Sequence, residues 1–274
     1  MKVLSLFDGI SAGQLALKQA NQTVDQYFAS EVDKYAIQLT QRNFPNTIQL
    51  GDVNNWREWD IPWAEIDLVM GGSPCQGFSF AGKQLNFDDP RSALFFVFVD
   101  ICHHVADHNP KMRFLLENVR MKKESQAVIT RYMGVEPIAI NSSLVSAQNR
   151  YRLYWTNIPN VTQPDDQGII LRDILETNSD LVDPIDERMV TSDGKSYCLT
   201  ARYDGAVAWN SIERKQRTMI AVDNNNFRKL TPVECERLQT FPDHFTEGVS
   251  KTQRYKALGN SWTVSVITHI FKNL

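Results

Sequence analysis

The first half of the chain alternates short apolar runs with segments of helical periodicity. Apolar runs predict strands at residues 3–7, 27–30, 66–70 and 114–116, and amphipathic stretches predict helices at 11–20, 33–43 and 92–108. Strands that alternate with helices are typical of an α/β protein with a mostly parallel sheet. We therefore expect an open α/β sheet, and such sheets bind ligands beyond the carboxyl ends of their strands.

The pattern loosens after residue 155. Polar residues and breakers dominate residues 157–227, where one short helix is predicted at 171–176. Helix signals return at Thr231-Pro232-Val233-Glu234, which has the spacing of a capping box with proline in the first turn. The final apolar run, 262–271, is a helix or a strand that returns to the main core. We expect one domain made of residues 1–156 and 228–274, and a small inserted domain at 157–227.

Composition limits the classes of protein that fit. The chain has 274 residues, of which 42% are hydrophobic, enough for a proper core. Its four cysteines form no C-x-x-C pair, so neither a metal site nor a disulfide framework is expected. No charged leader or membrane-length apolar run is present, and we expect a cytoplasmic protein.

Charge is distributed unevenly. The net charge of −3 argues weakly against a protein that coats nucleic acid, because phosphate binding needs a basic surface. Residues 188–229, however, carry eight Lys or Arg against four acids, a local excess of +4. Two interpretations stay open for this region: a solvated surface, or a face that binds nucleic acid.

The first strand leads into a turn that is typical of nucleotide-binding units. Gly9 follows this strand, and Glu31 lies 22 residues later, near the spacing at which a carboxylate reaches ribose hydroxyls. The turn lacks the full G-x-G-x-x-G pattern and carries Asp8, so it suits a cationic sulfonium better than a pyrophosphate. Asp52 could accept the adenine amino group, with Val53 packed on the ring. Each acid could equally be a surface residue that ends a strand.

Residues 71–79, Gly-Gly-Ser-Pro-Cys-Gln-Gly-Phe-Ser, carry the strongest chemical signal. Cys75 follows a proline just past a predicted buried strand, between glycines and serines, and this position exposes a thiol for reaction. The other three cysteines, Cys102, Cys198 and Cys235, are interpreted as small buried apolar side chains.

Five blocks resemble the cytosine-C5 DNA methyltransferase family in order and rough spacing. They are residues 7–13, Pro74-Cys75-Gln76, Glu117-Asn118-Val119, Gln148-x-Arg150-x-Arg152 and Gly259-Asn260-Ser261. The resemblance covers about residues 1–156 and 228–274, and within the family it is greatest to the de novo enzymes and small phage or bacterial relatives. It implies a Rossmann-like class I sheet that binds S-adenosyl-L-methionine, with a small inserted target-recognition domain. It also implies that the protein acts in a bacterial or phage-infected cell.

The resemblance also implies roles for individual residues. Cys75 would add to C6 of cytosine, Glu117 would act at N3 and Arg152 at O2. Arg150 would meet a phosphate or support the nucleophile loop, and we expect Arg150 and Arg152 to lie on one strand. The expected cofactor contacts are Phe7, Gly9, Ile10, Glu31, Asp52, Val53, Leu94, Asn260 and Trp262.

The expected substrate is double-stranded DNA, from which the cytosine must be flipped out of the helix before attack. The expected DNA contacts in the insert are Arg188, Lys195, Arg202, Arg214, Lys215 and Arg217. Two alternatives stay open. One is a transfer-RNA cytosine methyltransferase on the same scaffold, although the Cys-Phe-Thr element of that branch is missing after Glu117-Asn118-Val119. The other is a non-catalytic relative, which should have lost Cys75 or the cofactor turn.

Overall fold

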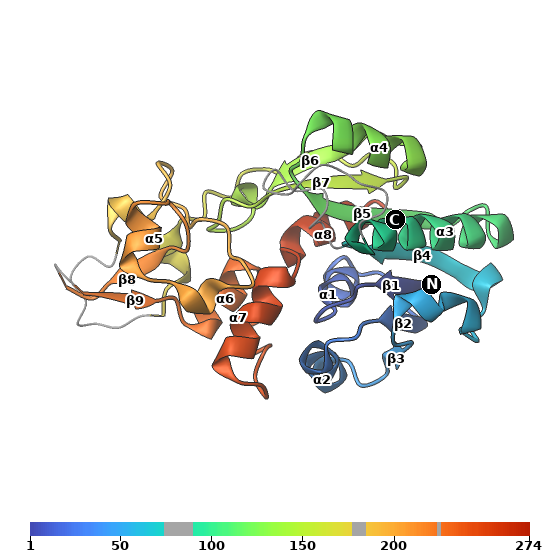
Figure 1. Cartoon of the computed structure of the whole chain (residues 1–274), viewed down its shortest axis with the longest axis horizontal. Helices are drawn as coiled ribbons and strands as arrows, with labels where there is room; N and C mark the ends of the chain where they lie inside the picture. Colours follow the sequence, from blue (N-terminus) through green and yellow to red (C-terminus); the bar gives the residue numbers. More distant parts are fainter. Residues whose placement is uncertain (74–89, 177–184, 224–225) are drawn as a thin grey trace. The chain divides into compact units, whose positions relative to one another are not determined.

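The computed structural model describes residues 1–73, 90–176, 185–223 and 226–274. The chain forms two compact units, each of which is discontinuous in sequence. Unit 1 consists of Met1–Ile140, Tyr151–Thr162 and Thr268–Leu274, and unit 2 of Asn141–Arg150 and Gln163–Ile267. Unit 2 therefore takes in more of the chain than the expected insert, because it includes the segment before residue 151 and the helices that follow residue 227 (Figure 1).

A seven-stranded sheet is the framework of unit 1. Its strands lie in the order β3-β2-β1-β4-β5-β7-β6. Their bounds are β1 (Lys2–Leu6), β2 (Gln26–Ser30), β3 (Ile48–Gln49), β4 (Ile66–Gly71), β5 (Arg113–Val119), β6 (Ile138–Asn141) and β7 (Tyr151–Thr156). Strands β1 to β5 pair in parallel, and β7 runs antiparallel to β5. The strand order reverses between β1 and β4, and at such a switch point the carboxyl ends of the strands border a ligand-binding crevice.

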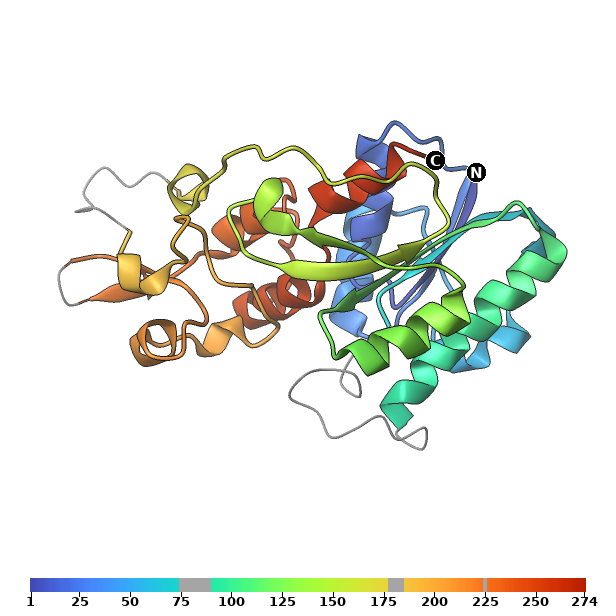
Figure 2. The ribbon, with the colours of Figure 1, turned by 90° about the horizontal axis from the view of Figure 1, so that it is seen from above.

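Helices cover the sheet because its strands alternate apolar side chains between two faces. Leu4 and Leu6 of β1 pack in one buried cluster with Phe95 and Phe98 of α3 (Pro90–His108) and with Ile129 of α4 (Lys123–Met133). Helices α3 and α4 run along the same side of the sheet (Figure 2). The interleaved positions of β1 face the opposite side, where α1 (Ala12–Gln19) and α2 (Lys34–Asn43) lie. The core of unit 1 is thus largely apolar.

Gly71, the last residue of β4, shows how closely β1 and β4 approach at the switch point. A Cβ atom at this position would lie 2.7 Å from the carbonyl oxygen of Leu6 and 3.1 Å from the ring of Phe98. Only glycine fits here without movement of the backbone. Glycine therefore lets β4 reach the edge of the sheet from which the chain continues towards Cys75.

Unit 2 contains short helices and one small hairpin. Its elements are η4 (Leu171–Ile174), η5 (Glu187–Met189), η6 (Tyr203–Gly205), α5 (Ala208–Ile212), β8 (Met219–Ala221), β9 (Phe227–Lys229), α6 (Pro232–Leu238), α7 (Lys251–Asn260) and the start of α8 (Val264–Phe271). η3 (Ser142–Leu144) precedes them. β8 and β9 pair antiparallel. With so few regular ladders, unit 2 depends on side chains to satisfy its buried backbone groups.

Buried amide and hydroxyl side chains supply those contacts. Gln148 donates to the carbonyl of Leu238 (2.7 Å) and to Oε1 of Gln239 (2.9 Å). Gln239 in turn donates to the carbonyl of Leu258 (2.8 Å) and accepts a hydrogen bond from Thr263 (2.8 Å). This chain of hydrogen bonds joins three segments that are far apart in sequence, and it does so without solvent contact.

Two glutamates with fully buried side chains extend this polar interior. Glu236 pairs with Arg254 (2.9 Å), and Glu234 pairs with Arg228 (2.7 Å). Glu234 also completes the capping box with Thr231 that the sequence predicts. Because buried charges are tolerated only when they are paired and hydrogen-bonded, these contacts fix the path of the chain around α6.

The elements predicted for the first half are found within a few residues of their predicted bounds. Asp33, expected near the start of a helix, accepts hydrogen bonds from Tyr35 and Ala36 as the N-cap of α2. The run at 262–271, left as helix or strand, forms the helix α8. The expectation that Arg150 and Arg152 lie on one strand is wrong: β7 begins at Tyr151, and Arg150 precedes it in unit 2.

Candidate active site

Cys75, the expected nucleophile, lies outside the described residues, but the chain that leads to it is described. β4 ends at Gly71, and the described chain ends at Ser73, which is buried. Asn118, near the end of β5, places its amide nitrogen 3.4 Å from the Ser73 hydroxyl and 3.5 Å from the Ser73 carbonyl. Asn118 therefore ties the end of β5 to a point two residues before Cys75, a contact for which sequence reasoning gave no role.

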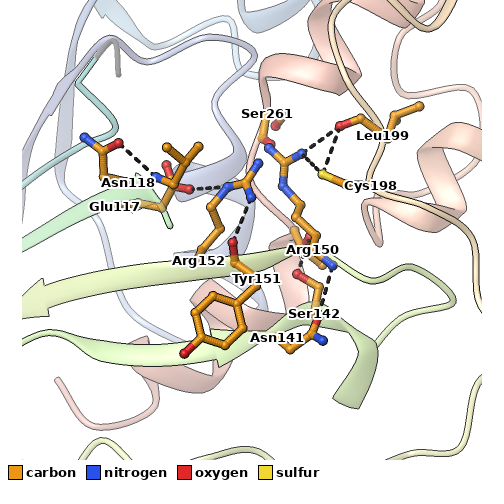
Figure 3. A network of polar contacts seen from close by, with 12 residues as sticks. Glu117, Asn118, Asn141, Ser142, Arg150, Tyr151, Arg152, Cys198, Leu199 and Ser261 are labelled. Atoms are coloured by element: carbon orange, nitrogen blue, oxygen red, sulfur yellow. Dashed lines mark hydrogen bonds and ion pairs between the residues drawn. The ribbon is translucent and has the colours of Figure 1, made fainter. Parts of the chain in front are cut away.

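Glu117 and Arg152, the expected partners of the cytosine ring, form an ion pair. Nε of Arg152 lies 2.9 Å from Oε1 of Glu117, and the two side chains are 14% and 11% exposed (Figure 3). Their proximity follows from the register of the antiparallel strands: Glu117 lies opposite Tyr154, and Val119 lies opposite Arg152. Glu117 and Arg152 are thus diagonal neighbours on one face of the sheet.

The ion pair of Glu117 and Arg152 brings a carboxyl group and a guanidinium together at the end of β5. Arg152 also donates to the carbonyl of Tyr151 (2.8 Å), which helps to hold its planar guanidinium in place. A guanidinium presents fixed N–H donors, and the neighbouring carboxyl group can transfer or share a proton. Together they suit a planar heterocycle that offers a carbonyl oxygen beside a ring nitrogen.

Arg150 has different surroundings from Arg152. It is only 4% exposed and lies in unit 2, where it donates to the carbonyls of Leu199 (2.8 Å) and Ser261 (2.8 Å). Longer contacts reach the carbonyl of Gly259 (3.4 Å) and the sulfur of Cys198 (3.5 Å) (Figure 3). A phosphate would have to displace these backbone acceptors, so the geometry favours a supporting role over the phosphate contact.

Gly259 explains why the segment around Arg150 packs so closely. A Cβ atom on Gly259 would lie 2.1 Å from the carbonyl carbon of Thr200, which no side chain allows. α7 therefore approaches the chain at Thr200 backbone to backbone, and Arg150 bridges the same two segments. Within the Gly259-Asn260-Ser261 block, glycine is therefore required at position 259 for the close packing of α7 against Thr200.

The turn after β1 is held in an unusual backbone conformation. Phe7, Gly9 and Ser11 all have positive φ angles, at 56°, 60° and 57°. Positive φ is rare for residues other than glycine and costs about 1–3 kcal/mol per residue, so the surroundings must hold Phe7 and Ser11 in place. Strain of this kind at a strand end of the switch point is typical of a ligand-binding turn.

Asp8 is the residue that braces this turn, and here the sequence interpretation needs correction. Its Oδ1 accepts a hydrogen bond from the Tyr27 hydroxyl (2.7 Å), and its Oδ2 accepts one from Ser11. Burial raises the pKa of the Asp8 carboxyl, although hydrogen bonds from Ser11, Ser5 and Tyr27 oppose the shift. The carboxyl group is committed to the scaffold, so it does not make the turn an anionic surface for a sulfonium.

Glu31 and Asp52 lie at the carboxyl ends of β2 and β3, as expected. Glu31 accepts hydrogen bonds from the backbone amides of Gly9, Val32 and Asp33, each at 2.8 Å. Its carboxylate thus links the β1 turn to the end of β2. Asp52 is exposed, and its Oδ1 accepts from the backbone and the side chain of Asn54, both at 2.9 Å.

The apolar residues expected around the cofactor differ in exposure. Ile10 and Val53 are buried, and Val53 belongs to the core cluster, against which Phe7 and Leu94 pack as partly exposed residues. Val32, which the sequence analysis did not single out, is 70% exposed beside Glu31. Val32 stands between Glu31 and Asp33, so the local sequence pattern gave no signal for an exposed apolar contact there. Asn260 and Trp262, also expected cofactor contacts, lie in unit 2 at the end of α7 and just beyond it.

The six cations expected to contact DNA fall into three groups, the last of which is Lys195 alone. Arg202, Arg214 and Lys215 are exposed and form no ion pair among the described residues. Arg188 is paired with Asp186 (2.5 Å), and Arg217 donates to the carbonyl of Gly205 (2.9 Å).

Lys195 is the clearest departure from the expected DNA contacts. It is 5% exposed, and its ammonium group donates to the carbonyls of Ser143 (2.5 Å), Ile169 (2.8 Å) and Ser146 (3.3 Å). A buried ammonium with three acceptors is not available to a phosphate. We therefore remove Lys195 from the set of DNA contacts.

The described residues contain neither a membrane-spanning helix nor a metal-binding cluster. Among them, no helix has the length and apolar character needed to cross a membrane. No group of three or more His, Cys, Asp or Glu side chains in the described ranges is arranged to hold a metal ion.

The sheet and the residues at its edge define a methyltransferase-like α/β enzyme, and the comparisons identify the family. The model of the C-5 cytosine-specific DNA methylase family matches residues 1–160 and 148–274, and so runs through the region that seemed unmatched in sequence. The chain belongs to this family, and it is a DNA (cytosine-5-)-methyltransferase. The predicted resemblance and the preference for DNA over RNA are thus confirmed.

Two curated relatives of this chain are type II methyltransferases. The chain is 32% identical to the type II methyltransferase M1.ScrFI of Lactococcus lactis subsp. cremoris, covering 100% of this chain and 77% of the relative. It is also 32% identical to the type II methyltransferase M.NlaX of Neisseria lactamica, covering 100% of this chain and 96% of the relative.

Solved structures share the fold. Dnmt2 of S. pombe superposes with a TM-score of 0.70 at 21% identity, covering 99% of this chain and 97% of that one. A putative DNA modification methyltransferase encoded within a prophage of E. coli gives a TM-score of 0.67 at 22% identity, covering 100% and 98%. The expected α/β sheet of a class I methyltransferase is thus confirmed.

Proposed function

We propose that this enzyme methylates cytosine in double-stranded DNA through a covalent adduct with Cys75, while Glu117 and Arg152 hold the base. The ion pair of Glu117 and Arg152 carries the proposal, because it puts a carboxyl group and a guanidinium side by side at the end of β5. β5 pairs with β4, the strand from which the chain continues to Cys75.

The chemistry requires each of these groups. The Cys75 thiolate adds to C6, and the ring electrons then move towards C5, which becomes nucleophilic. Glu117 protonates or hydrogen-bonds N3, where negative charge would otherwise build up. C5 takes the methyl group, then loses its proton to a base, and the thiolate leaves as the ring regains aromaticity.

Arg152 is assigned the O2 carbonyl of the base. Its guanidinium already contacts Glu117, so a cytosine ring that enters the site exchanges part of this ion pair for hydrogen bonds at O2 and N3. Preorganised donors of this kind contribute to catalysis because they need little reorganisation when charge develops. We assign Arg150 to support of the Gly259-Asn260-Ser261 segment.

The edge formed by β1, β2 and β3 fits S-adenosyl-L-methionine, which supplies a methyl group already activated by its sulfonium. We assign Phe7, Gly9 and Ile10 to the methionine portion, Glu31 to the ribose hydroxyls and Asp52 to the adenine amino group. Val32 is added as the exposed apolar contact for the ring, since Val53 is buried in the core. Leu94, Asn260 and Trp262 remain proposed contacts.

Unit 2 is proposed to contain the target-recognition region, within residues 157–227. The target cytosine must leave the duplex before Cys75 can reach C6, and DNA contacts outside the pocket hold the opened duplex. The proposed contacts are narrowed to Arg202, Arg214 and Lys215. Because few side chains reach base edges from so small a region, we expect a short recognition site of about two to four base pairs.

Methyl transfer with a tritiated donor tests the proposal. The protein is incubated with unmethylated duplex DNA, with transfer RNA or without nucleic acid, and the label is located by nucleoside analysis. We expect label in 5-methylcytosine of the DNA alone, and none with Cys75→Ala. Label in transfer RNA only, or undiminished transfer by Cys75→Ala, would contradict it.

A further inference from the structure

Trp209 is the most exposed aromatic side chain of unit 2 for which an exposure is known. Its residue is 55% exposed, and the neighbouring Val207 is 54% exposed. The guanidinium carbon of Arg214 lies 4.2 Å from the centre of the Trp209 ring, the geometry of a cation–π contact. A single exposed apolar side chain is ordinary, so the charges around this stacked pair decide what kind of partner fits it.

The short helix that carries Trp209 is braced from inside. In α5, Asn210 and Ser211 are buried; Asn210 donates to the carbonyl of Gly205 (3.3 Å), and Ser211 donates to the carbonyl of Arg217 (2.5 Å). The amide of Gln216 donates to the carbonyl of Asn210 (3.0 Å), which closes the loop beyond the helix. With its inner face fixed in this way, α5 holds Trp209 on its outer face.

The charges around Trp209 distinguish this segment from the rest of unit 2. Elsewhere in unit 2 the arginines and lysines with ion pairs include Arg188, Arg228, Lys229, Arg237 and Arg254. Within residues 202–217, by contrast, four Lys or Arg stand against two acids, a net charge of +2.

Three of those four cations, Arg202, Arg214 and Lys215, have no ion pair among the described residues. One of the two acids, Asp204, is already paired with Lys229 (3.0 Å). The chain as a whole has a net charge of −3. A cluster of unpaired cations on an acidic protein fits a polyanion.

We propose that Trp209 and Arg214 form a DNA-contacting pair, in which the indole packs on a DNA base and the Arg214 guanidinium binds the neighbouring phosphate. This inference rests on the proposed function, and it names the residues of unit 2 that contact the substrate. The combination of an aromatic face with a stacked guanidinium matches an opened duplex, because flipping out the target cytosine unstacks the adjoining bases and exposes their π faces next to an anionic backbone. A protein surface would not require the unpaired cations.

Duplex binding by variants tests the pair. Binding of a fluorescein-labelled 40-base-pair duplex that contains the methylated site, mapped by sequencing, is measured by anisotropy at several salt concentrations. Stacking of a base on an aromatic residue contributes about 1–3 kcal/mol, so Trp209→Ala should weaken binding about tenfold or more, and Trp209→Phe less. Arg214→Ala should lower the dependence of log K on log salt by about one, because one phosphate contact is lost.

Arg214→Lys separates stacking from charge, since lysine keeps the charge but loses the planar group. It should retain the salt dependence and still weaken binding. Matched controls come from α4 of unit 1, where Arg131 and Tyr132 are adjacent and exposed. Arg131→Ala and Tyr132→Ala should bind the duplex like the wild type.

The outcomes separate this inference from the proposed function. If the wild type transfers no methyl group to DNA, the proposed function fails. If the wild type methylates DNA, but Trp209→Ala and Arg214→Ala bind the duplex with unchanged affinity and salt dependence, only the present inference fails. Thermal unfolding of each variant is measured in parallel, and Trp209→Phe, which keeps a ring, provides the comparison should Trp209→Ala unfold.

Discussion

The two units of the molecule are stabilised in different ways. Unit 1 has a seven-stranded sheet whose interior is mainly aliphatic and aromatic, so non-directional burial accounts for most of its stability. Unit 2 has few ladders, and buried groups such as Gln148, Arg150, Gln239 and Glu236 connect its segments. The site residues of unit 1 are therefore positioned by a regular sheet, whereas the positions of those in unit 2 depend on specific hydrogen bonds and ion pairs.

The largest effect is expected at Glu117, on the regular framework of unit 1. Glu117→Gln removes the proton donor for N3 while keeping the shape of the side chain. Because general acid catalysis contributes about 10²- to 10⁴-fold, kcat should fall by that factor. Single-turnover methyl transfer gives the rate, and duplex affinity should change little. A kcat within threefold of the wild type would remove Glu117 from the chemistry.

A large loss of stability is expected at Arg150, in unit 2. Arg150→Ala removes the charged donor to the carbonyls of Leu199 and Ser261, and hydrogen bonds to charged groups contribute about 1.5–3 kcal/mol each, so unit 2 should lose about 3 kcal/mol. Hydrogen exchange of backbone amides reports each unit separately, and protection should fall in unit 2 alone.

Arg202→Ala serves as the control for Arg150→Ala, because Arg202 is exposed and lies in the same unit. It should change stability by less than about 0.5 kcal/mol. Equal losses of protection in both units with Arg150→Ala would contradict the separate roles assigned to the two interiors.

A smaller effect is expected at Tyr27, which braces the cofactor turn through Asp8. Tyr27→Phe deletes the 2.7 Å hydrogen bond and leaves the ring in place. A typical hydrogen bond contributes about 1 kcal/mol, so KM for S-adenosyl-L-methionine should rise about fivefold while kcat stays within twofold. Tyr35→Phe, in α2, is the control and should change neither constant. A fall in kcat with KM unchanged would show that Tyr27 acts in another way.

The smallest effect is a pH dependence of stability at Asp8. Desolvation raises the pKa of its carboxyl group in the folded state, so the folded state binds the proton more tightly than the unfolded state does. The contribution of Asp8 is therefore complete at pH values below the ordinary carboxyl pKa and declines as the pH rises through the raised pKa. Asp8→Asn should flatten this decline in urea unfolding curves. Parallel pH profiles for wild type and variant would contradict the account.

Sequence reasoning succeeded where local patterns decide the structure. The strands around Leu4 and Val69 are contiguous apolar runs, and Asp33 and Thr231 cap helices through neighbours two or three residues away. These contacts are local, so the pattern itself specifies them. Glu117 and Arg152 were linked to one base only by the family resemblance, because the antiparallel pairing of β5 with β7 cannot be derived from local patterns.

Sequence reasoning failed where partners are distant in the chain. The acceptors of Arg150 lie 49 and 111 residues away, and those of Lys195 lie 26 to 52 residues away. A basic residue in a polar stretch resembles a surface residue until these partners are known. Asp8 shows a second limit, because a charged residue in a turn does not reveal towards which side its carboxyl group points.

The most direct test of the central claim first maps the methylated site by sequencing and then uses duplex DNA with 5-fluorocytosine at that site. Fluorine at C5 cannot leave as a proton does, so the adduct formed after methyl transfer cannot resolve. With S-adenosyl-L-methionine, the wild type should form a denaturant-resistant protein–DNA complex in which mass spectrometry finds the base on Cys75, and Cys75→Ala should form none. A complex of equal yield with Cys75→Ala, or attachment at another residue, would contradict the account.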